Sequence, residues 1–345
     1  MVQYGSAFKH TVSKKLMNLI IYFTLFFFLA FFTLKFYLKY SLKKQILDRN
    51  DFDVGNKITP TGSGIAFCFL FFLGSFYFYF YDLNFFNNFP NRWYLLYLSL
   101  FLFSVLSFYD DLKPIHPVYR LIAQFILVFF STTTINALEI QIPLKLLIFF
   151  LIVTWVYIIN ITNFLDGLDG LLVSHSVFLL ISVILIKLIL GIELFSYFIA
   201  IILLPILLAF FIFNKPIAKL YMGDAGSVFL GYLFGFIILE LISKKFFLLA
   251  ISLYIYPFLD CGITLVKKML NGHYPWARLF DYFFLAPVIR GNRTHVYVLT
   301  ISFIFSCINT ILILLQIYIS SYFFILNFIF ALFQIYIFNR VSKKY

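Results

Sequence analysis

The sequence has 345 residues, of which 63% are hydrophobic, 23% aromatic and only 12% charged, and its mean hydropathy is +1.00. Soluble globular chains carry about 25% charged residues, so this composition excludes an ordinary soluble domain and indicates a chain whose solvent is mostly lipid. The net charge of +12 would suggest a nucleic-acid partner in a soluble protein. Here the Lys and Arg residues lie between apolar runs, where they orient helices and attract phosphate groups. We therefore expect a lipid bilayer, and no nucleic acid, as a partner.

Eleven apolar runs are close to the length of about 20 residues that crosses a hydrocarbon layer. They lie at residues 16–38, 64–81, 93–109, 117–137, 143–160, 170–191, 194–213, 225–243, 246–266, 296–315 and 319–338. The longest gap between runs, Lys267 to His295, is too short for a soluble domain. The sequence therefore predicts an all-α, polytopic integral membrane protein with about 11 transmembrane helices, forming a single domain over residues 1–345.

The distribution of charge predicts the orientation of these helices. If the runs alternate across the membrane, one side receives 17 of the 26 Lys and Arg residues. The side richer in Lys and Arg is cytoplasmic in most membrane proteins. Ten of the 14 acidic residues fall on the same side. Because carboxylates near a bilayer are costly unless they are paired or bind a cation, their clustering predicts a site in cytoplasmic loops.

The first polar motif, Phe108-Tyr109-Asp110-Asp111-Leu112-Lys113, ends the third apolar run. Two adjacent carboxylates repel each other, which raises the proton affinity of one of them unless a cation lies close by. Asp110 and Asp111 are therefore suited to metal coordination, to proton abstraction, or to a division of the two roles. The same pair before a lysine is also common at helix ends that have no such role.

The second motif, Asn160-Ile-Thr-Asn-Phe-Leu-Asp-Gly-Leu-Asp-Gly170, lies between two very apolar runs. If it is helical, steps of three residues rotate each side chain by about 60° from the last, so Asn163, Asp166 and Asp169 fan over one face. Glycines 167 and 170 remove side-chain bulk where a phosphate or a nucleobase can approach the backbone. An ordinary polar helix end needs far fewer polar residues, so this motif indicates a site.

The third motif runs from Asn214 to Ser227. Pro216 and Gly223 punctuate a loop, and Asp224 opens the next apolar helix, where free backbone N–H groups favour anions. Asp224 is either a helix cap or part of a site. Its position on the same side as the other acidic motifs favours a site.

The longest loop adds basic residues to this side. Arg293 and His295 follow Gly291 and are suited to hold a diphosphate, and Lys57 in the first loop is placed to do the same. Lys267 and Lys268 are interpreted only as topology signals.

Taken in order, these residues resemble the polyprenyl-phosphate N-acetylhexosamine-1-phosphate transferase family. That family includes the phospho-N-acetylmuramoyl-pentapeptide transferase of wall synthesis and the enzymes that start O-antigen and related glycans. The resemblance covers about residues 40 to 300. Its matching pieces are the segment Lys57–Gly64, the pair Asp110-Asp111, the run Asn160–Gly170, the run Asn214–Ser227, Asp260 and His295.

The resemblance implies roles for particular residues. Asp224 and Asp166 would bind Mg²⁺, with Mn²⁺ as the alternative ion. The residues assigned to catalysis, as further coordination, as a base or at the diphosphate, are Asp110, Asp111, Asp166 and His295. The residues assigned to substrate binding, including a uridine pocket around Asp169, Asn214 and Tyr221, are Lys57, Asn160, Asn163, Asp169, Asn214, Tyr221 and Arg293.

The resemblance also implies a reaction and a location. An N-acetylhexosamine 1-phosphate would pass from a UDP-sugar to undecaprenyl phosphate, with release of UMP, at the cytoplasmic face of the bacterial inner membrane. A homodimer is allowed, because dimers occur in relatives. In the last inner loop, the segment Asn292-Arg-Thr-His-Val-Tyr297 carries a single histidine, His295, where the wall enzymes usually carry a histidine cluster, which favours the branch that starts O-antigen, capsule or similar glycans. The wall-precursor transferase remains the alternative, and a transporter is a remote one, because the carboxylates collect at loop edges and the sequence shows no internal repeat.

Overall fold

The computed structural model describes residues 2–49, 58–81, 92–135, 144–274 and 282–342. In these ranges the chain forms helices joined by short loops, with one small hairpin. The hairpin strands are β1 Leu47–Arg49 and β2 Ile58–Pro60, paired antiparallel with Asp48 opposite Thr59. The helices are α1 Val2–Lys44, α2 Gly64–Tyr81, α4 Trp93–Leu112, α5 Pro117–Thr132, α6 Leu144–Leu165, α7 Leu171–Leu190, α8 Phe195–Asn214, α9 Gly223–Ser243, α10 Phe247–Leu253, α11 Ile255–Leu270, α12 Ala286–Ile289, α13 His295–Tyr318 and α14 Phe323–Ser342.

Each of the eleven apolar runs coincides with a helix, or with the pair α10 and α11. An all-α architecture follows because lipid offers no hydrogen bonds, so a spanning backbone must satisfy its own polar groups. Eight helices in the described ranges are long and apolar enough to cross a membrane, and the pair α10 and α11, bent by 73°, would be a ninth span. α5 and the Gly64–Phe80 part of α2 are apolar but shorter. The fold class is confirmed, whereas helix length does not confirm a count of eleven.

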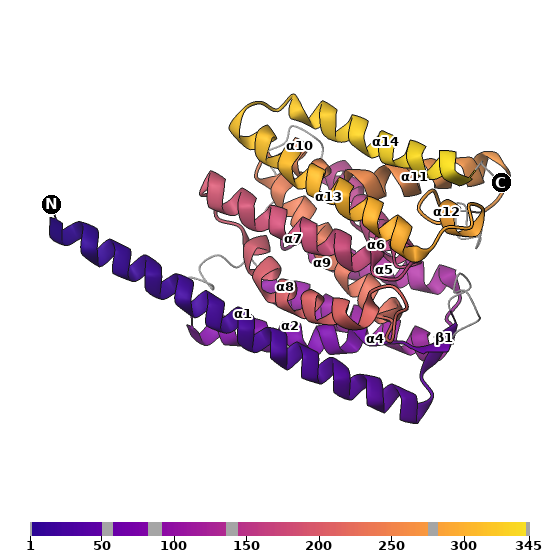
Figure 1. Cartoon of the computed structure of the whole chain (residues 1–345), viewed down its shortest axis with the longest axis horizontal. Helices are drawn as coiled ribbons and strands as arrows, with labels where there is room; N and C mark the ends of the chain where they lie inside the picture. Colours follow the sequence, from indigo (N-terminus) through magenta and orange to yellow (C-terminus); the bar gives the residue numbers. More distant parts are fainter. Residues whose placement is uncertain (1, 50–57, 82–91, 136–143, 275–281, 343–345) are drawn as a thin grey trace.

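Helix α9 lies at the centre of the bundle and packs against α4 and α6 (Figure 1). It can be buried on all sides because small residues let its neighbours approach. A Cβ atom on Gly231 would lie 2.8 Å from the Cα atom of Ile159, and one on Gly235 would overlap the ring of Trp155. The Trp155 ring stacks on Tyr232 with centroids 5.1 Å apart, and its Nε1 donates to the Tyr232 carbonyl at 2.8 Å. The contact between α6 and α9 therefore sets the spacing of the two helices that carry most of the polar motifs.

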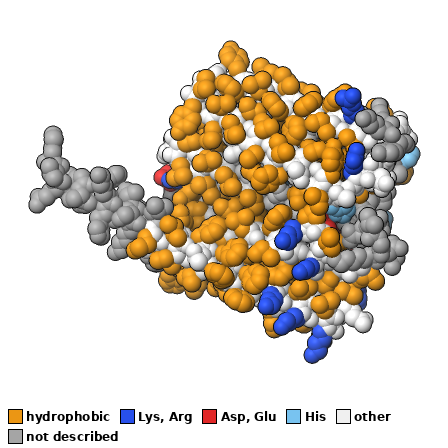
Figure 2. Space-filling model, in the orientation of Figure 1, with side chains coloured by type: hydrophobic (Ala, Val, Ile, Leu, Met, Phe, Trp, Pro, Cys, Tyr) orange, Lys and Arg blue, Asp and Glu red, His pale blue; other side chains and the backbone are white. Residues whose placement is uncertain are grey.

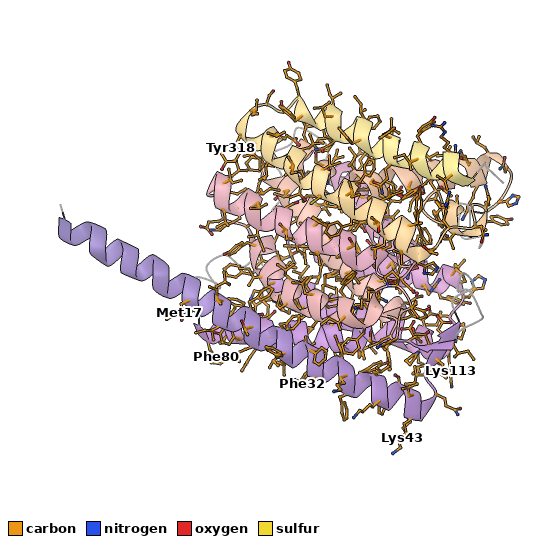
Figure 3. The ribbon with its side chains drawn as sticks, in the orientation of Figure 1. Met17, Phe32, Lys43, Phe80, Lys113 and Tyr318 are labelled. Atoms are coloured by element: carbon orange, nitrogen blue, oxygen red, sulfur yellow. The ribbon has the colours of Figure 1, made fainter. Side chains whose placement is uncertain are left out.

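The polar loops gather at one end of this bundle. Lys43 and Lys113 lie at one end in Figure 3, and Phe80 and Tyr318 lie at the other. Figure 2 shows a broad hydrophobic surface, with Lys and Arg side chains collected toward the end where β1 and α12 lie in Figure 1. The predicted alternation of the runs, which places the 39–63 and 110–116 segments on one side, agrees with this arrangement. The chain is a multi-pass membrane protein by these features.

Candidate functional site

An ion-pair cluster joins the ends of α4, α5 and α9. Arg120, in the first turn of α5, places its Nη1 atom 2.5 Å from Asp110 Oδ2 and 2.5 Å from Asp224 Oδ2. The second oxygen of Asp110 accepts from the backbone N–H of Ile115 at 2.5 Å. Two carboxylates that are 114 positions apart in the sequence therefore share a single guanidinium.

Asp111 has a different partner from its neighbour. Its carboxylate accepts from the backbone N–H groups of Asp224 at 2.8 Å and Ala225 at 3.1 Å, and so caps the first turn of α9. Gly223, the first residue of α9, has φ of +70°, and a Cβ atom there would lie 2.5 Å from the Asp111 carboxylate. Because Asp111 satisfies these N–H groups, Asp224 is not the cap of its own helix, and the capping alternative for Asp224 is wrong.

Asn163, near the end of α6, completes the contacts of Asp224. Its Nδ2 atom donates to Asp224 Oδ1 at 2.8 Å and to Ser227 Oγ at 2.9 Å. Both oxygens of Asp224 are thus directed by side chains from other helices, Arg120 on one side and Asn163 on the other. This fixes the orientation of the carboxylate that the sequence assigns to the cation.

Asp166 lies just beyond the end of α6. The expectation that Asn163, Asp166 and Asp169 share one helical face is wrong, because α6 ends at Leu165 and the chain turns before α7. Gly170, with φ of +73°, makes this turn in a conformation that other residues rarely adopt. Asp166 stays half-buried, and loss of solvation raises the pKa of its carboxyl well above the usual value, with Asp224 and Asp111 adding to the rise.

A second cluster forms around Asp169, which is only 3% exposed. Its Oδ2 atom accepts from the backbone N–H groups of Ile217 and Ala218, both at 3.0 Å, and lies 3.4 Å from Nδ1 of His295 at the start of α13. Asn214 supports the same region. Its Oδ1 accepts from the N–H of Gly170 at 3.0 Å, and its Nδ2 donates to the Leu220 carbonyl at 3.1 Å.

The remaining predicted substrate residues are more scattered. Asn160 donates to Gln124 Oε1 at 2.7 Å and to the Val156 carbonyl at 2.8 Å, within the helical layer. Arg293 is exposed, and its guanidinium lies over the ring of Tyr297, 5.4 Å from the centroid. Lys57 lies outside the described residues.

Tyr221 is half-buried in the loop before α9 and connects that loop to the first one. Its backbone N–H donates to the Pro60 carbonyl at 2.8 Å, and its carbonyl accepts from Ser63 Oγ at 2.9 Å. The hairpin that ends at Pro60 is thereby held against the segment that leads to Asp224.

Asp260 belongs to the matched motifs, but among the described residues all of its hydrogen bonds are to other residues of the protein that hold a loop in place. Its carboxylate accepts from the backbone N–H groups of Phe283 at 2.9 Å and Phe284 at 3.1 Å, and from the Tyr256 hydroxyl at 2.7 Å. It therefore braces the loop before α12.

The oxygen donors of the ion-pair cluster suit Mg²⁺, which prefers hard oxygen ligands. Within the described ranges, no three Asp, Glu, His or Cys side chains are grouped so as to hold a metal ion by themselves. Mg²⁺ commonly takes one or two protein carboxylates and completes its shell with water and substrate phosphates. Asp224 and Asp166 are two such carboxylates, and they lie close enough for the charge of Asp224 to raise the pKa of Asp166.

Arg120 is a functional candidate that none of the sequence motifs indicated. A signal for it exists in the sequence. Arg120, Gln124 and Ser131 lie on one stripe of an otherwise apolar helix, and each contacts a polar side chain of a neighbouring helix. A polar stripe on an apolar helix points into the protein rather than toward lipid.

Part of the chain is similar in sequence to known proteins. Residues 93–242 match Glycosyl transferase family 4. A probable undecaprenyl-phosphate N-acetylglucosaminyl 1-phosphate transferase of Bacillus subtilis is 28% identical over 152 residues, which cover 43% of this chain and 38% of the relative. A phospho-N-acetylmuramoyl-pentapeptide-transferase of Leuconostoc citreum is 39% identical over 90 residues, 24% of this chain and 27% of the relative.

A phospho-N-acetylmuramoyl-pentapeptide-transferase of Streptococcus sanguinis is 27% identical over 235 residues, 62% of this chain and 69% of the relative. The matches to the Bacillus and Leuconostoc proteins thus span well under half of those relatives. The region shared with the family contains Asp110, Asp111, Asp166 and Asp224. The resemblance inferred from the sequence is confirmed, because residues 93–242 of this chain match the model of glycosyl transferase family 4 and the relatives carry names from that group of enzymes.

Proposed function

We propose that this protein transfers a sugar 1-phosphate from a nucleotide sugar to a polyprenyl phosphate in the membrane. The observation that carries the proposal is the convergence of Asp110, Asp224 and Arg120 at one end of an apolar helix bundle. Carboxylates in such a position are costly unless they serve a cation or a charged substrate. A lipid acceptor in the bilayer and a water-soluble donor meet only at such an end.

The proposed reaction is a single phosphoryl exchange. An oxygen of the lipid phosphate attacks the β-phosphorus of the donor, and the bond from that phosphorus to the bridging oxygen breaks. The products are a lipid diphosphate sugar and a nucleoside monophosphate. Such transfers depend on positioning and charge neutralisation more than on covalent chemistry.

Asp224 and Asp166 are the proposed holders of Mg²⁺, with Mn²⁺ as the alternative. Bound there, the ion would neutralise charge on the donor diphosphate. Asn163 orients Asp224 through the 2.8 Å hydrogen bond. Asp111 fixes the first turn of α9 and therefore the position of Asp224 relative to the other helices.

Asp166 is the proposed general base. Asp110 is paired with Arg120, and Asp111 accepts two backbone N–H groups, so both carboxylates are engaged. In the described part of the chain, the Asp166 carboxylate accepts no hydrogen bond, and burial favours its protonated form. It is therefore the acid among these three that is best placed to exchange a proton with the substrate.

The cluster around Asp169 is the proposed donor site. The Oδ2 atom of Asp169 lies 3.4 Å from Nδ1 of His295 and so places that ring beside the buried carboxylate. Lys57 and Arg293 are proposed to join His295 at the diphosphate. The residues proposed for the uridine side are Asn160, Asn163, Asp169, Asn214 and Tyr221.

The finer proposal is a UDP-N-acetylhexosamine donor and an undecaprenyl phosphate acceptor, at the cytoplasmic face of a bacterial inner membrane. It is supported by the name of the Bacillus relative and by the single histidine, His295, in the segment Asn292–Tyr297. On this proposal the product starts O-antigen, capsule or a related envelope glycan. A second candidate, transfer of phospho-N-acetylmuramoyl-pentapeptide, is favoured by the Streptococcus match, which covers 69% of that relative.

The experiment that tests these proposals is a substrate panel with purified protein. Undecaprenyl phosphate is supplied with UDP-GlcNAc, UDP-GalNAc, a 6-deoxy relative or UDP-MurNAc-pentapeptide, and UMP release and the mass of the lipid product are measured. UMP release with one UDP-N-acetylhexosamine supports the first candidate, and release only with the pentapeptide donor supports the second. No UMP release with any donor, from protein that is folded and supplied with Mg²⁺ or Mn²⁺, would reject both.

A further inference from the structure

A partly open cavity with both polar and apolar lining lies between the membrane helices, apart from the carboxylate cluster. It is formed between α7, the break between α10 and α11, α13 and α14, and the space open to the centre of a water molecule is about 30 Å³. Its polar lining comes from His175, Tyr256, Ser306, Asn309, Asn327 and Gln334. No Lys, Arg, Asp or Glu side chain lines it, so the cavity offers neutral hydrogen-bonding groups and no charge to hold an ion.

Three of these side chains carry buried polar atoms that find no hydrogen-bond partner in the described part of the chain. The atoms are His175 Nε2, Asn309 Oδ1, and both Oδ1 and Nδ2 of Asn327. Asn327 is only 1% exposed. The other polar groups are engaged: Nδ1 of His175 lies 3.3 Å from Ser306 Oγ, and Nδ2 of Asn309 donates to the Ser252 carbonyl at 3.0 Å. These four atoms therefore belong to residues that line the same cavity.

The depth of the cavity makes these atoms significant. α13 runs from His295 to Tyr318, so at a rise of 1.5 Å per residue Ser306 lies about 16 Å from its start and Asn309 about 13 Å from its end. Bilayer hydrocarbon at this depth supplies no hydrogen bonds, and an orphaned polar group there is costly. The four atoms need a partner that the helices do not provide.

We propose that this cavity is a built binding site for ordered water. A water molecule needs about 10–15 Å³ of such space and two to four polar partners, so the cavity holds about two molecules. Asn327 supplies a donor and an acceptor, and Asn309 supplies an acceptor. His175 Nε2 donates to water if it carries the ring proton and accepts from water if it does not. The rings of Phe305 and Phe330, 6.3 Å apart and half-buried, line the same cavity and contribute its apolar wall.

The bound water has a structural role at the helix break. α10 and α11 meet at Tyr254 with a bend of 73°, and residues on both sides of the bend, Leu253 and Ile255, line the cavity. Irregular backbone at membrane depth is tolerated where it lines a hydrated cavity or lies inside protein. Hydration therefore allows this span to break within the bundle.

The cavity is also connected to the loop that leads to the candidate site. The His175 ring stacks on Tyr256, with centroids 5.5 Å apart and planes nearly parallel. The Tyr256 hydroxyl donates to Asp260, which braces the N–H groups of Phe283 and Phe284. Water that holds His175 in place thus supports the position of this loop.

Radiolytic footprinting of the whole protein in H₂¹⁸O tests the proposal directly. X-rays generate hydroxyl radicals from water, and a bound water modifies the side chains beside it. We expect Phe305 and Phe330 to be modified more than Phe130, a phenylalanine on α5 that is 48% exposed and does not line the cavity. After the protein is mixed with H₂¹⁸O, the two cavity rings should take up ¹⁸O more slowly than side chains of solvent-exposed loops, because the site exchanges slowly. Modification of Phe305 and Phe330 no greater than that of Phe130 would overturn the proposal, and so would a ligand in the cavity that carries no exchangeable oxygen.

A stability measurement provides a second test that does not depend on the proposed function. Asn327→Leu keeps the number and branching of the side-chain heavy atoms and removes both polar atoms. In a hydrated cavity it deprives the water of partners, and Tm should fall by roughly 1–3 °C. In a dry cavity it removes two orphaned atoms, and Tm should rise. Gln334→Leu is the matched control, because Gln334 lines the same cavity but already donates to Ser302 Oγ at 3.3 Å, so its Tm should fall in either case. An unchanged or higher Tm for Asn327→Leu would reject the water site.

Discussion

Arg120 lies 2.5 Å from Asp224 Oδ2, so the carboxylate proposed to bind a divalent cation already carries a cationic partner from its own chain. The same guanidinium nitrogen reaches Asp110. With 35% of its side chain exposed, Arg120 is accessible from the loop end of the bundle, while Asp110 is 7% exposed. Because Asp110 is buried, removal of Arg120 would leave the charge of this carboxylate without a compensating cation, which is unfavourable. Arg120 therefore keeps the acidic cluster together when no ion or substrate is bound.

Replacement of Arg120 should separate cation binding from turnover. Arg120→Gln removes a positive charge that competes for Asp224, so we expect the affinity of the protein for Mn²⁺, measured by electron paramagnetic resonance, to rise by about tenfold, equivalent to about 1.4 kcal/mol. Turnover should fall because Asp110 and Asp224 lose their common partner. Lys113→Gln is the control, since Lys113 is an exposed basic residue in the same loop. An Mn²⁺ affinity that is the same in Arg120→Gln and in the native protein would contradict the competition.

Replacement of the proposed metal ligands should abolish the reaction without unfolding the chain. Asp224→Asn keeps the size of the side chain but removes the charge, and we expect kcat/KM to fall by about 10³-fold or more, which corresponds to about 4 kcal/mol of transition-state stabilisation. Asp166→Asn should have an effect in the same direction. Glu193→Gln makes the same chemical change at an exposed position between α7 and α8 and should leave turnover unchanged. Activity of Asp224→Asn and Asp166→Asn equal to that of Glu193→Gln would remove both residues from the proposed site.

The contact between Gly223 and Asp111 can be tested with a pair of glycines. Gly223→Ala and Gly191→Ala both force a side chain into the left-handed region, with φ of +70° and +63°. Only at position 223 does the added Cβ atom meet another group, the Asp111 carboxylate at 2.5 Å, whereas nothing lies within 4 Å at position 191.

We therefore expect Gly223→Ala to lower Tm more than Gly191→Ala, by an amount equivalent to roughly 1–2 kcal/mol, the usual value of a lost helix cap. Gly223→Ala should also reduce turnover, because the cap positions Asp224. Equal Tm values for the two variants would show that Asp111 does not hold the start of α9.

The affinity of the protein for the divalent ion should rise with pH, over a pH range that lies above the usual pKa of an aspartate. Burial first, and then Asp224 and Asp111, raise the pKa of Asp166, so its carboxyl keeps its proton to a higher pH than an exposed aspartate does. Ligation requires the ionised form, so binding should release a proton and strengthen as pH rises through the raised pKa. The same shift means that Asp166 destabilises the fold progressively as pH rises above the ordinary aspartate pKa of about 3.9. Titration of Mn²⁺ affinity against pH should show this rise in the native protein and a weaker one in Asp166→Asn, and equal profiles would reject the assignment of Asp166.

Much of the candidate site could be predicted from the sequence because its motifs are local. Asp110 with Asp111, the run Asn160–Gly170 and Asp224 stand out against apolar surroundings, and the structure brings the first and third of these into direct contact. The charge distribution likewise predicted which loops share an end of the bundle, since Lys43 and Lys113 lie together and away from Tyr318.

The partners within the site could not be predicted in the same way. Which carboxylate caps α9, which one shares Arg120 and where α6 ends depend on how α4, α5, α6 and α9 pack, and residues such as Gly231 and Gly235 decide that spacing through close contacts with Ile159 and Trp155. The prediction that Asn163, Asp166 and Asp169 share one helical face was wrong because α6 ends at Leu165. The position of that end depends on how the helices pack.

The sequence by itself determined the solvent of this protein and the positions of its helices, because a backbone in hydrocarbon has to form helices wherever apolar runs are long enough. Only the tertiary structure decided how the polar residues are paired. Arg120 meets Asp224 across 104 positions, and His175, Asn309 and Asn327 meet around one cavity from three different helices. Such pairings follow from the angles and distances between packed helices, which no periodicity along a single segment contains.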